Sequence, residues 1–336
     1  MFDLDSARQR LTGRTILVTG AAGFLGSCIV RHLATVPCTI RRLTRRGRPL
    51  AIDGVATIED VVGDVRELQT WMTAIDGVDV VLHLAAQTSV YTADNDPAAD
   101  LAANVQPVLH LVEACRVSRN HLTVVAAGTV TVVGLTTSAE PQDESYPERP
   151  ITFYDLHKWM AEQYLEAYTR KGLLAATTLR LANVYGPGPQ GSSADRGFLS
   201  AMVRRALAGD ALTLYGTGRV VRDYVYVDDV ARAFLAAAAC IDAVQGQHFL
   251  VGSGRGTSIA EALQCVSQRV ARRTGRRVPI TSVEPPASLS PIENRSFVAD
   301  TRRLRAATGW SARVNLEEGI DRTVEAFCSR PLAIEG

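Results

Sequence analysis

The sequence predicts an α/β fold: a doubly wound parallel sheet of the Rossmann type, followed by a smaller C-terminal α/β lobe. Short apolar strands alternate with helical segments through about residue 180, which is typical of a parallel sheet with right-handed crossovers. A glycine-rich turn directly follows the first strand. From Asn183 onward, glycine and proline cluster in GPGPQGSSADRG, where we expect the second lobe to begin. We therefore assign residues 1–182 to the first domain, with 223–252 returning to it, and residues 183–222 and 253–336 to the second.

The stretch TILVTGAAGFLGS, residues 15–27, carries the strongest signal in the first domain. Its apolar start suits a central strand, and Gly20, Gly23 and Gly26 follow at intervals of three. These glycines permit a tight turn, a close backbone approach to a pyrophosphate and close packing of the next helix. We expect Phe24 and Leu25, between the glycines, to bind the cofactor together with Gly20, Gly23 and Gly26. The helix N-terminus then favours an anion. The alternative is a tight turn that recruits glycines without binding anything.

Composition narrows the class of protein. A net charge of +1 argues against a nucleic-acid surface, and the arginines within residues 269–277 are interpreted as a solvated helix face. The six cysteines show no CxxC spacing, so we expect reduced core residues and no metal site. No signal-peptide pattern and no apolar run of about 20 residues occurs, so we expect a cytoplasmic protein that does not enter a membrane. Residues 1–13 are interpreted as a short leader outside the first strand.

The second strand, residues 38–43, ends where such folds meet the adenosine ribose. An acidic residue there would accept from the 2′-OH of NAD, and an arginine would pair with the 2′-phosphate of NADP. No Asp or Glu occurs between Pro37 and Ile52, whereas Arg45 and Arg46 occupy the turn. A guanidinium binds phosphate through two parallel hydrogen bonds, which favours NADP. A solubilising basic loop is the alternative.

The remaining elements follow from apolar runs and helical periodicity. We expect strands at residues 56–62, 78–84 and 122–126, and helices at 67–74, 97–118, 152–169, 258–273 and 316–327. The segment 223–239 is expected to return to the large domain. Small residues after the strand at 78–84 leave room for a cofactor, and His83 is interpreted as a packed core histidine.

The helix at 152–169 contains the stretch that points to chemistry, YDLHK. It places Tyr154 and Lys158 four residues apart on one helical face. A lysine beside a tyrosine favours the ionised phenol, which can exchange a proton with a substrate hydroxyl or carbonyl. YxxxK alone is common in amphipathic helices. Combined with the TGxxGxxG turn and the hydroxyl of Thr129 at the end of the intervening strand, it becomes specific.

With these motifs, the chain resembles the extended short-chain dehydrogenase/reductase family, of the NAD-dependent epimerase/dehydratase type. The resemblance runs over nearly the whole chain. It rests on the following stretches: TGAAGFLG, GDV at 63–65, HLAA at 83–86, YDLHK, LRLANVYGPG at 179–188, YGTGRVVRDYVYVDDVA at 215–231, and TGW with LEEGI within 308–320.

Carried over residue by residue, the resemblance implies Thr129, Tyr154 and Lys158 as catalytic residues, with Lys158 also binding the nicotinamide ribose. It implies Asp64 and Val65 at the adenine. Leu84, Ala85 and Ala86 line the cofactor site. The resemblance also implies that Asn183, Arg222 and Arg295 surround the nucleotide diphosphate of a sugar substrate, and Thr88 is expected at the same substrate. Around Arg295 the local motif is loose, and a surface arginine is the alternative. The helices at 97–118 and 152–169 pair across a dimer in the family, so we expect a homodimer.

Two departures narrow the activity. Dehydratases of this family carry Asp-Glu after the catalytic threonine and decarboxylases keep the Glu, whereas this chain has Val130 and Thr131. Dehydration and decarboxylation therefore lack their acid. The family's tyrosine before the next glycine is replaced by Val133, which removes one expected substrate contact.

Epimerisation and one-way ketone reduction remain, and the cofactor discriminates between them. With Arg45 and Arg46 present, we expect an NADPH-dependent ketoreductase acting on a nucleotide-linked, TDP-type, 4-keto-6-deoxyhexose. Two further stretches, MVRRALAGDALTLYGTG from Met202 and GIDRTVEAF from Gly319, are similar to TDP-4-keto-6-deoxyhexose 4-ketoreductases of antibiotic deoxysugar pathways. The alternative is an NAD-dependent nucleotide-sugar 4-epimerase that uses the same residues. A non-catalytic dinucleotide sensor is a third hypothesis, against which the intact Thr129, Tyr154 and Lys158 weigh.

Overall fold

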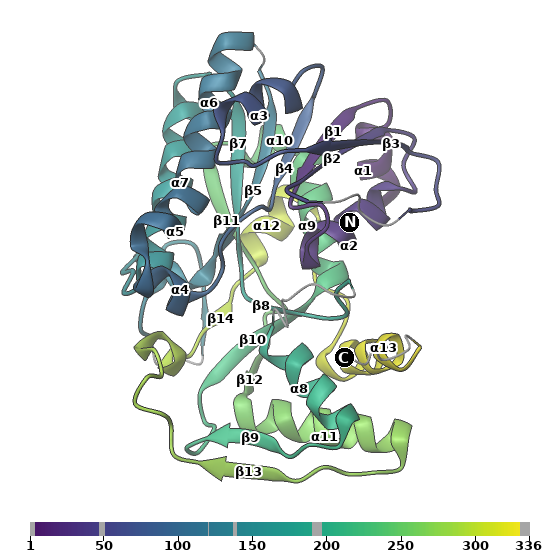
Figure 1. The fold of residues 1–336 in the computed structure, drawn as a ribbon, viewed down its shortest axis with the longest axis vertical. Helices are drawn as coiled ribbons and strands as arrows, with labels where there is room; N and C mark the ends of the chain where they lie inside the picture. The colour runs from purple at the N-terminus through teal and green to yellow at the C-terminus, as the bar shows by residue number, and fades with distance from the viewer. Residues whose placement is uncertain (1–3, 47–50, 120, 137–139, 190–196, 330–336) are drawn as a thin grey trace.

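A seven-stranded parallel sheet forms the upper part of the molecule (Figure 1). The structure, a computed structural model, describes residues 4–46, 51–119, 121–136, 140–189 and 197–329. The strand order is β11-β7-β5-β4-β1-β2-β3. The bounds of these strands are β1 Thr15–Thr19, β2 Thr39–Thr44, β3 Thr57–Val62, β4 Val80–His83, β5 Thr123–Thr129, β7 Ala175–Leu181 and β11 Gln247–Val251. The chain builds outward from β1 in one direction and then returns to build from β4 in the other, so the predicted doubly wound sheet is confirmed.

Apolar side chains on both faces of the central strands explain why the sheet is buried between two helical layers. Ile16 and Val18 face one core, and Leu17 between them faces the other; all three are fully buried. Helices α1, α2 and α9 supply the first core, and α3, α6 and α7 supply the second. The helices on this sheet are α1 Leu4–Leu11, α2 Phe24–Leu33, α3 Leu68–Ala74, α4 Val90–Asn95, α5 Pro97–Asn104, α6 Gln106–Ser118, α7 Phe153–Arg170, α9 Val227–Ala239, α10 Ile241–Val244 and α12 Arg302–Thr308.

Smaller sheets and three helices lie below the large sheet (Figure 1). The three-stranded sheet has the order β12-β10-β8, and β9 pairs with β13 and β6 with β14. Their bounds are β6 Pro141–Gln142, β8 Asn183–Tyr185, β9 Leu212–Tyr215, β10 Val221–Tyr226, β12 Gly256–Ser258, β13 Ile280–Val283, β14 Val298–Ala299, α8 Phe198–Ala208, α11 Ile259–Thr274 and α13 Leu316–Cys328. Residues 223–252 are expected to return to the first domain. Within them, α9 packs on α2 and β11 forms an edge of the large sheet, whereas β10 belongs to the three-stranded sheet. The exact domain boundaries stay a prediction.

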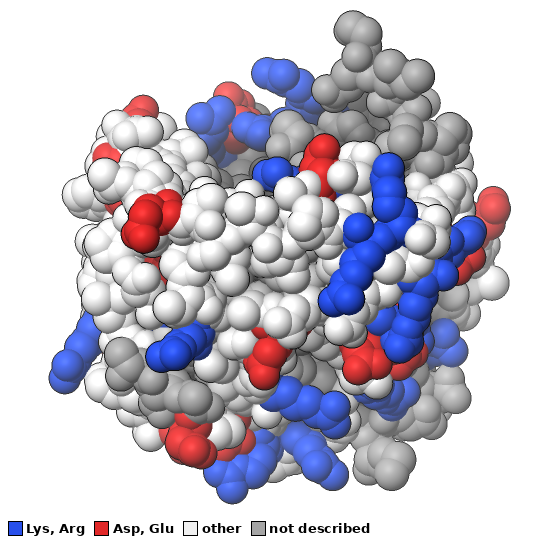
Figure 2. Space-filling model, turned by 90° about the horizontal axis from the view of Figure 1, so that it is seen from below, with Lys and Arg blue, Asp and Glu red and all other residues white. Residues whose placement is uncertain are grey.

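The lower face carries mixed charge (Figure 2). Arg269 on α11 pairs with Asp321 and with Glu317 of α13, and Arg272 and Arg273 are exposed. These contacts agree with the interpretation of a solvated helix face for residues 269–274, whereas residues 275–277 lie beyond the end of α11. Among the described residues, none of the helices has the length and apolar character that a membrane crossing requires.

The expected single helix at 97–118 is wrong. The structure has two helices, α5 and α6, which meet at Val105. Pro107 lies in the first turn of α6. Its ring nitrogen cannot donate to the preceding turn, and that missing bond ends α5. Asp96, whose side chain accepts from the Ala99 N–H, caps α5 and separates it from α4.

Two smaller expectations also change. Residues 4–11 lie outside the first strand, as expected, but they form a helix, α1, whose Ala7 and Leu11 are buried against the core. All six cysteines are free thiols, but only Cys28, Cys38 and Cys115 are buried. Cys240 and Cys265 are half-buried and Cys328 is exposed, because it ends α13.

The glycine turn generates a testable consequence. A Cβ atom on Gly26 would lie 2.1 Å from the Gly20 carbonyl oxygen, whereas one on Gly23 would lie 3.1 Å from the same atom. We expect Gly26→Ala to lower the free energy of unfolding by about 1–3 kcal/mol, because rigid backbone must move apart. Urea denaturation measures this loss. Gly23→Ala is the matched control and should cost less; equal losses would contradict the steric explanation.

Candidate active site

The carboxyl ends of β1 and β4 flank the point where the strand order reverses, which is where open α/β sheets bind their ligands. Gly20 follows β1 and has a φ of +66°. A Cβ atom added to Gly20 would lie 3.1 Å from the backbone nitrogen of Ala85, so the two backbones approach closely. Thr19 ties the two strand ends together. Its Oγ1 accepts from the backbone N–H groups of Leu84 (3.0 Å) and Ala85 (3.1 Å). The predicted residues Leu84, Ala85 and Ala86 are all half-buried here.

The N-terminus of α2 opens onto this crevice. Gly23 is its N-cap and makes no side-chain capping hydrogen bond, and the first turn of this helix holds no acidic residue. The first backbone N–H groups of α2 are therefore available to an anion, and the helix dipole favours one. Phe24 and Leu25, in that turn, are half-buried, and the Phe24 ring lies 3.2 Å from where a Cβ on Gly188 would be. The uncapped turn and the close glycine approach fit a dinucleotide pyrophosphate.

The end of β2 is basic, as expected. Arg45 and Arg46 follow Thr44 and are exposed. Asp64 is half-buried nearby, and its carboxyl lies 2.6 Å from the Arg66 guanidinium. This contact lowers the pKa of the Asp64 carboxyl, and the backbone N–H of Arg66 and the charge of Arg45 add to the effect. Val65 is buried. An acidic partner for the ribose is thus absent from β2 and its described flank, residues 39–46.

Thr129, Tyr154 and Lys158 come from two elements that pack against each other. Thr129 ends β5, is buried, and leads into the 3₁₀ helix η1 (Val130–Val133). Helix α7 begins at Phe153 and contacts both β5 and η1, so Tyr154 and Lys158 lie in its first two turns, both half-buried. Thr152 caps α7 by accepting from the Asp155 N–H, which fixes where this helix starts.

Lys158 is surrounded by protein, and burial lowers its pKa to about 8. The carboxylates of Asp100 and Glu162 oppose part of this shift. His83 lies buried behind it, and burial together with the Lys158 charge lowers the pKa of His83 to about 3. His83 Nδ1 lies 2.9 Å from Thr19 Oγ1. His83 is thus a packed neutral core histidine, as predicted.

A buried polar network next to Lys158 was missed by the sequence reasoning. Asp100 on α5 lies 2.7 Å from His157 Nδ1 on α7, and its other oxygen accepts from Gln87 (2.7 Å) and Asn104 (2.9 Å). The Asn104 amide also donates to the Gln87 carbonyl. The one sequence signal for this network is the spacing of Asp100 and Asn104, because residues four apart lie on the same face of a helix. The network joins the loop after β4 to α5 and α7.

The expected substrate residues divide into two groups. Arg222 and Arg295 are both buried, so the surface alternative for Arg295 is wrong. Arg222 donates to the Glu293 carbonyl at 2.8 Å. Three guanidinium nitrogens have no hydrogen-bond partner in the described part of the chain: Nη1 of Arg222, and Nε and Nη1 of Arg295. Burial lowers the pKa of Arg295 to about 10, and the charge of Arg222 adds to this effect. Asn183 is half-buried on β8, beside Tyr224 of β10, and Thr88 is exposed.

The two positions after Thr129 are Val130 and Thr131, neither of which has a carboxylate. A carboxylate from another element, Asp155 of α7, lies close to Thr131. Val130 and Val133 are buried in the core. Thr131 is half-buried, and its hydroxyl lies 2.8 Å from that of Thr129. Asp155, which neighbours Tyr154 on α7, is fully buried, and Thr131, Thr152 and Arg295 are among the groups near its carboxyl. No sequence pattern marked it.

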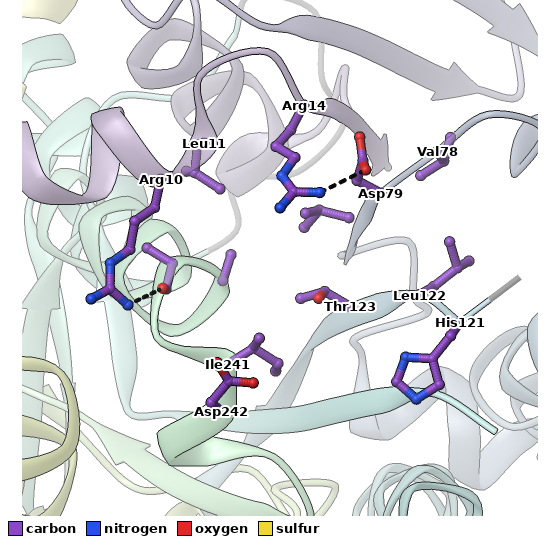
Figure 3. A pocket seen from close by; sticks show the side chains of 13 residues that line it. Arg10, Leu11, Arg14, Val78, Asp79, His121, Leu122, Thr123, Ile241 and Asp242 are labelled. Atoms are coloured by element: carbon purple, nitrogen blue, oxygen red, sulfur yellow. Dashed lines mark hydrogen bonds and ion pairs between the residues drawn. The ribbon is translucent and has the colours of Figure 1, made fainter. Parts of the chain in front are cut away.

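Other groups of polar side chains lie away from this crevice. A cavity of about 500 Å³ lies at the opposite, amino ends of β1, β4 and β5 (Figure 3). Three of its charged groups are engaged: Arg14 pairs with Asp79 at 2.9 Å, and Arg10 donates to the Ala239 carbonyl at 3.0 Å. It is not lined by the uncapped end of α2 or by Thr129, Tyr154 and Lys158, so the region at the carboxyl ends of the strands is the candidate active site.

Two clusters have ligand-type side chains at metal-compatible spacing: Cys28, His32 and Asp228, and Glu148, Glu162 and His248. Arginines already neutralise both. Arg322 lies 4.0 Å from Asp228, and Arg180 pairs with Glu162 at 2.5 Å.

Comparison with known proteins gives concordant matches. Residues 16–252 match the model of the NAD dependent epimerase/dehydratase family. A UDP-glucose 4-epimerase of Mycolicibacterium smegmatis is 33% identical, over 93% of this chain and 97% of that protein. The structure of UDP-glucose 4-epimerase from Thermotoga maritima, solved with UDP-glucose, superposes with a TM-score of 0.82 at 29% identity, covering 94% and 99% of the two chains. That of the Thermus thermophilus enzyme, in complex with NAD, gives 0.79 at 31% identity, with coverage of 94% and 99%.

The buried network predicts the effect of losing His157. We expect His157→Ala to lower the free energy of unfolding by about 1.5–3 kcal/mol, because the buried Asp100 carboxylate loses a charge-assisted hydrogen bond. Urea denaturation is the measurement. Arg116→Ala, which removes the exposed pair with Glu113, is the control and should change it by less than about 1 kcal/mol. Similar losses for both variants would mean that Gln87 and Asn104 alone satisfy Asp100.

Proposed function

Since the chain belongs to the NAD dependent epimerase/dehydratase family, we propose that it catalyses hydride transfer at C4 of a nucleotide-linked hexose, as a nucleotide-sugar 4-epimerase. The observation that carries this proposal is the packing of α7, which bears Tyr154 and Lys158, against β5, which ends at Thr129, on the sheet whose strand order reverses between β1 and β4. The relatives support the substrate class, because the Mycolicibacterium smegmatis protein and both solved structures are named UDP-glucose 4-epimerases.

The cofactor fits the crevice through the uncapped N-terminus of α2 and the glycines of residues 20–26. When bound, a nicotinamide supplies reversible hydride transfer. Tyr154 exchanges a proton with the oxygen at C4, and Lys158 supports the ionised phenol with its charge. Since the Lys158 pKa is about 8, that charge is present below pH 8 and is lost as the pH rises through this value. Thr129 donates a hydrogen bond to the same C4 oxygen.

Arg222 and Arg295 hold the nucleotide diphosphate in this proposal. Their unpartnered nitrogens are buried, which is costly until an anion accepts from them. A planar guanidinium fork matches a phosphate through two parallel bonds. Asn183 is assigned to the same diphosphate, Thr88 to the substrate, and Asp64 and Val65 to the adenine.

The second candidate is the NADPH-dependent 4-ketoreductase of 4-keto-6-deoxyhexoses. One observation favours it: Arg45 and Arg46 are exposed at the end of β2, where a 2′-phosphate would lie, without an acidic ribose partner in residues 39–46. The relatives favour the epimerase, so NADP dependence and a role in antibiotic deoxysugar formation belong to this second candidate.

We also propose a homodimer built on α5, α6 and α7, which lie together along one side of the molecule (Figure 1). Leu101, Val117 and Tyr164 are exposed on these three helices, and Tyr164 stacks on Tyr168. A second copy would cover these apolar side chains.

The deciding experiment compares cofactor stoichiometry. UDP-galactose with catalytic NAD should give UDP-glucose without net change in reduced-nicotinamide absorbance, because an epimerase returns the hydride. TDP-4-keto-6-deoxyglucose with NADPH is the competing assay. Stoichiometric NADPH oxidation there, without epimer exchange in the first assay, would replace the epimerase by the reductase.

Tyr154→Phe should lower kcat about 10²- to 10⁴-fold, the usual contribution of general acid–base catalysis. Cofactor binding, measured by fluorescence titration, should stay unchanged, because the phenyl ring keeps its packing. Phe153→Leu, at an exposed neighbouring position, is the control for α7. A Tyr154→Phe variant that keeps more than a tenth of the activity would remove Tyr154 from the proton-transfer role.

Replacing both Arg45 and Arg46 by alanine distinguishes the two cofactor hypotheses. If these side chains bind a 2′-phosphate, NADPH affinity falls by about 1.5–3 kcal/mol per lost contact while NADH affinity is kept. For an NAD-dependent epimerase, we expect both affinities to change by less than about 1 kcal/mol. Calorimetric titration of both cofactors measures the difference, and Arg66→Ala, beside Asp64, is the basic-residue control.

A further inference from the structure

A thiol, an imidazole and a carboxylate meet where α2 packs against the start of α9. Cys28 and His32 lie four residues apart on α2, so both side chains leave one face of this helix. Asp228 lies in the first turn of α9, 200 residues from Cys28 along the chain. The absence of CxxC spacing predicts no metal site, but local spacing says nothing about ligands that come from two distant helices.

The three ligand atoms of this cluster lie close enough to share one ion. Cys28 Sγ donates to Asp228 Oδ1 at 3.0 Å, and His32 Nε2 lies 3.4 Å from the same oxygen. All three atoms lie within 4.8 Å of one another. Zinc bonds of about 2.0–2.3 Å in a tetrahedral site place neighbouring ligand atoms about 3.3–3.6 Å apart. The two separations are close to this range, so small side-chain rotations bring the three atoms around one centre.

The chemistry of the donor set favours zinc. Thiolate and imidazole are ligands that Zn²⁺ prefers, whereas Ca²⁺ and Mg²⁺ take oxygen ligands. Cys28 is fully buried, while the side chains of His32 and Asp228 are 25% and 31% exposed. An ion therefore reaches the cluster from the solvent side, and water has access to a fourth coordination position.

The arginines beside the cluster are not firmly held there. Arg322 balances the charge of Asp228 from 4.0 Å, but the same guanidinium lies 2.6 Å from Glu318, and the Arg322 side chain is 48% exposed. Arg31, whose positive charge also acts on Cys28 and Asp228, is exposed. Both guanidinium groups can turn toward water. A cation that replaces Arg322 at Asp228 leaves the pair with Glu318 intact.

The second cluster of ligand-type side chains differs in this respect. Its two carboxylates, of Glu148 and Glu162, are both paired with Arg180, at 2.6 and 2.5 Å. The Arg180 side chain is 1% exposed, so moving its guanidinium aside would leave a buried charge unpaired, which is strongly unfavourable. Of the two clusters, the one between α2 and α9 therefore fits a cation.

We propose that Cys28, His32 and Asp228 bind one Zn²⁺ ion, which ties α2 to α9. The thiol proton passes to solvent when Sγ coordinates the ion, His32 coordinates through Nε2 as a neutral imidazole, and water completes the tetrahedron. Helix α2 presents its open N-terminus to the crevice, and α9 follows β10, which bears Arg222. The ion is a structural clamp between the large sheet and the three-stranded sheet. This inference does not depend on the proposed C4 activity.

Zinc titration of the full-length protein tests the site. After treatment with a chelator and dialysis, the wild type should bind one equivalent of Zn²⁺, and its Tm should rise with zinc concentration, because binding to the native state stabilises it. His32→Ala and Asp228→Asn should each weaken binding by at least about 100-fold, since even the loss of a partner outside the ligand set costs about 10- to 100-fold. In both variants the zinc-dependent rise in Tm should disappear.

Cobalt reports on the thiolate directly, because Co²⁺ accepts the same nitrogen and sulfur ligands as Zn²⁺. The wild type with Co²⁺ should show the near-ultraviolet charge-transfer absorption of a thiolate–cobalt bond, and Cys28→Ala should lack it. Cys240→Ser removes a half-buried thiol outside the cluster and is the matched control. This control should keep both the absorption and the zinc-dependent rise in Tm.

Three results would overturn the proposal: no zinc binding by the wild type, equal zinc binding by the wild type and His32→Ala, or a cobalt spectrum without the thiolate absorption. If Cys28→Ala does not fold, His32→Ala and Asp228→Asn are sufficient, because both positions are partly exposed. A protein that binds one zinc ion through these residues but shows no C4 turnover would reject the proposed function and keep the metal site.

Discussion

The molecule depends on how closely α2 approaches the end of β1. Gly26 lies against the Gly20 carbonyl so tightly that no side chain fits between them, and Gly20 in turn lies against the backbone at Ala85. These two contacts hold β1, α2 and the loop after β4 in one compact corner. The open end of α2 and the floor of the crevice both result from that packing, so the geometry of the site is a consequence of backbone contact more than of any polar side chain.

Buried carboxylates attach the lower sheets to this corner. Asp223 on β10 accepts from the backbone N–H groups of Ser253, Gly254 and Ala299, which join β10 to the turn after β11 and to β14. Asp229 accepts from Arg313 and Val314 in the same way. Burial raises the pKa of Asp223, while the donated bonds oppose that shift and favour the carboxylate. Arg222, adjacent to Asp223, is thereby held near Glu293 and Arg295.

The site concentrates charged groups that the protein leaves incompletely paired. Asp155, Arg222 and Arg295 are all nearly inaccessible to water, and each has polar atoms without partners in the described chain. Such an arrangement is unfavourable for stability and is typical of sites that a ligand completes. Lys158 is another charged group at this site, and its burial lowers its pKa toward the working pH range. By contrast Arg180, equally buried, is paired with Glu148 and Glu162 and is structural.

The sequence by itself determined the fold class and the local motifs. Short apolar runs, typical of buried strands, predicted β1, β4 and β5. The glycines of the first turn and the spacing of Tyr154 and Lys158 could also be predicted, because they depend only on residues that are neighbours along the chain. The break at Val105 was missed because helical periodicity continues through it, although Pro107 offered a signal. What only the tertiary structure decided was which distant polar residues meet. Asp100 with His157, and Thr131 with Asp155 and Arg295, are brought together by the packing of α5, η1 and the segment before β14 against α7. Burial and pairing depend on elements far apart in the chain, and no local pattern encodes them.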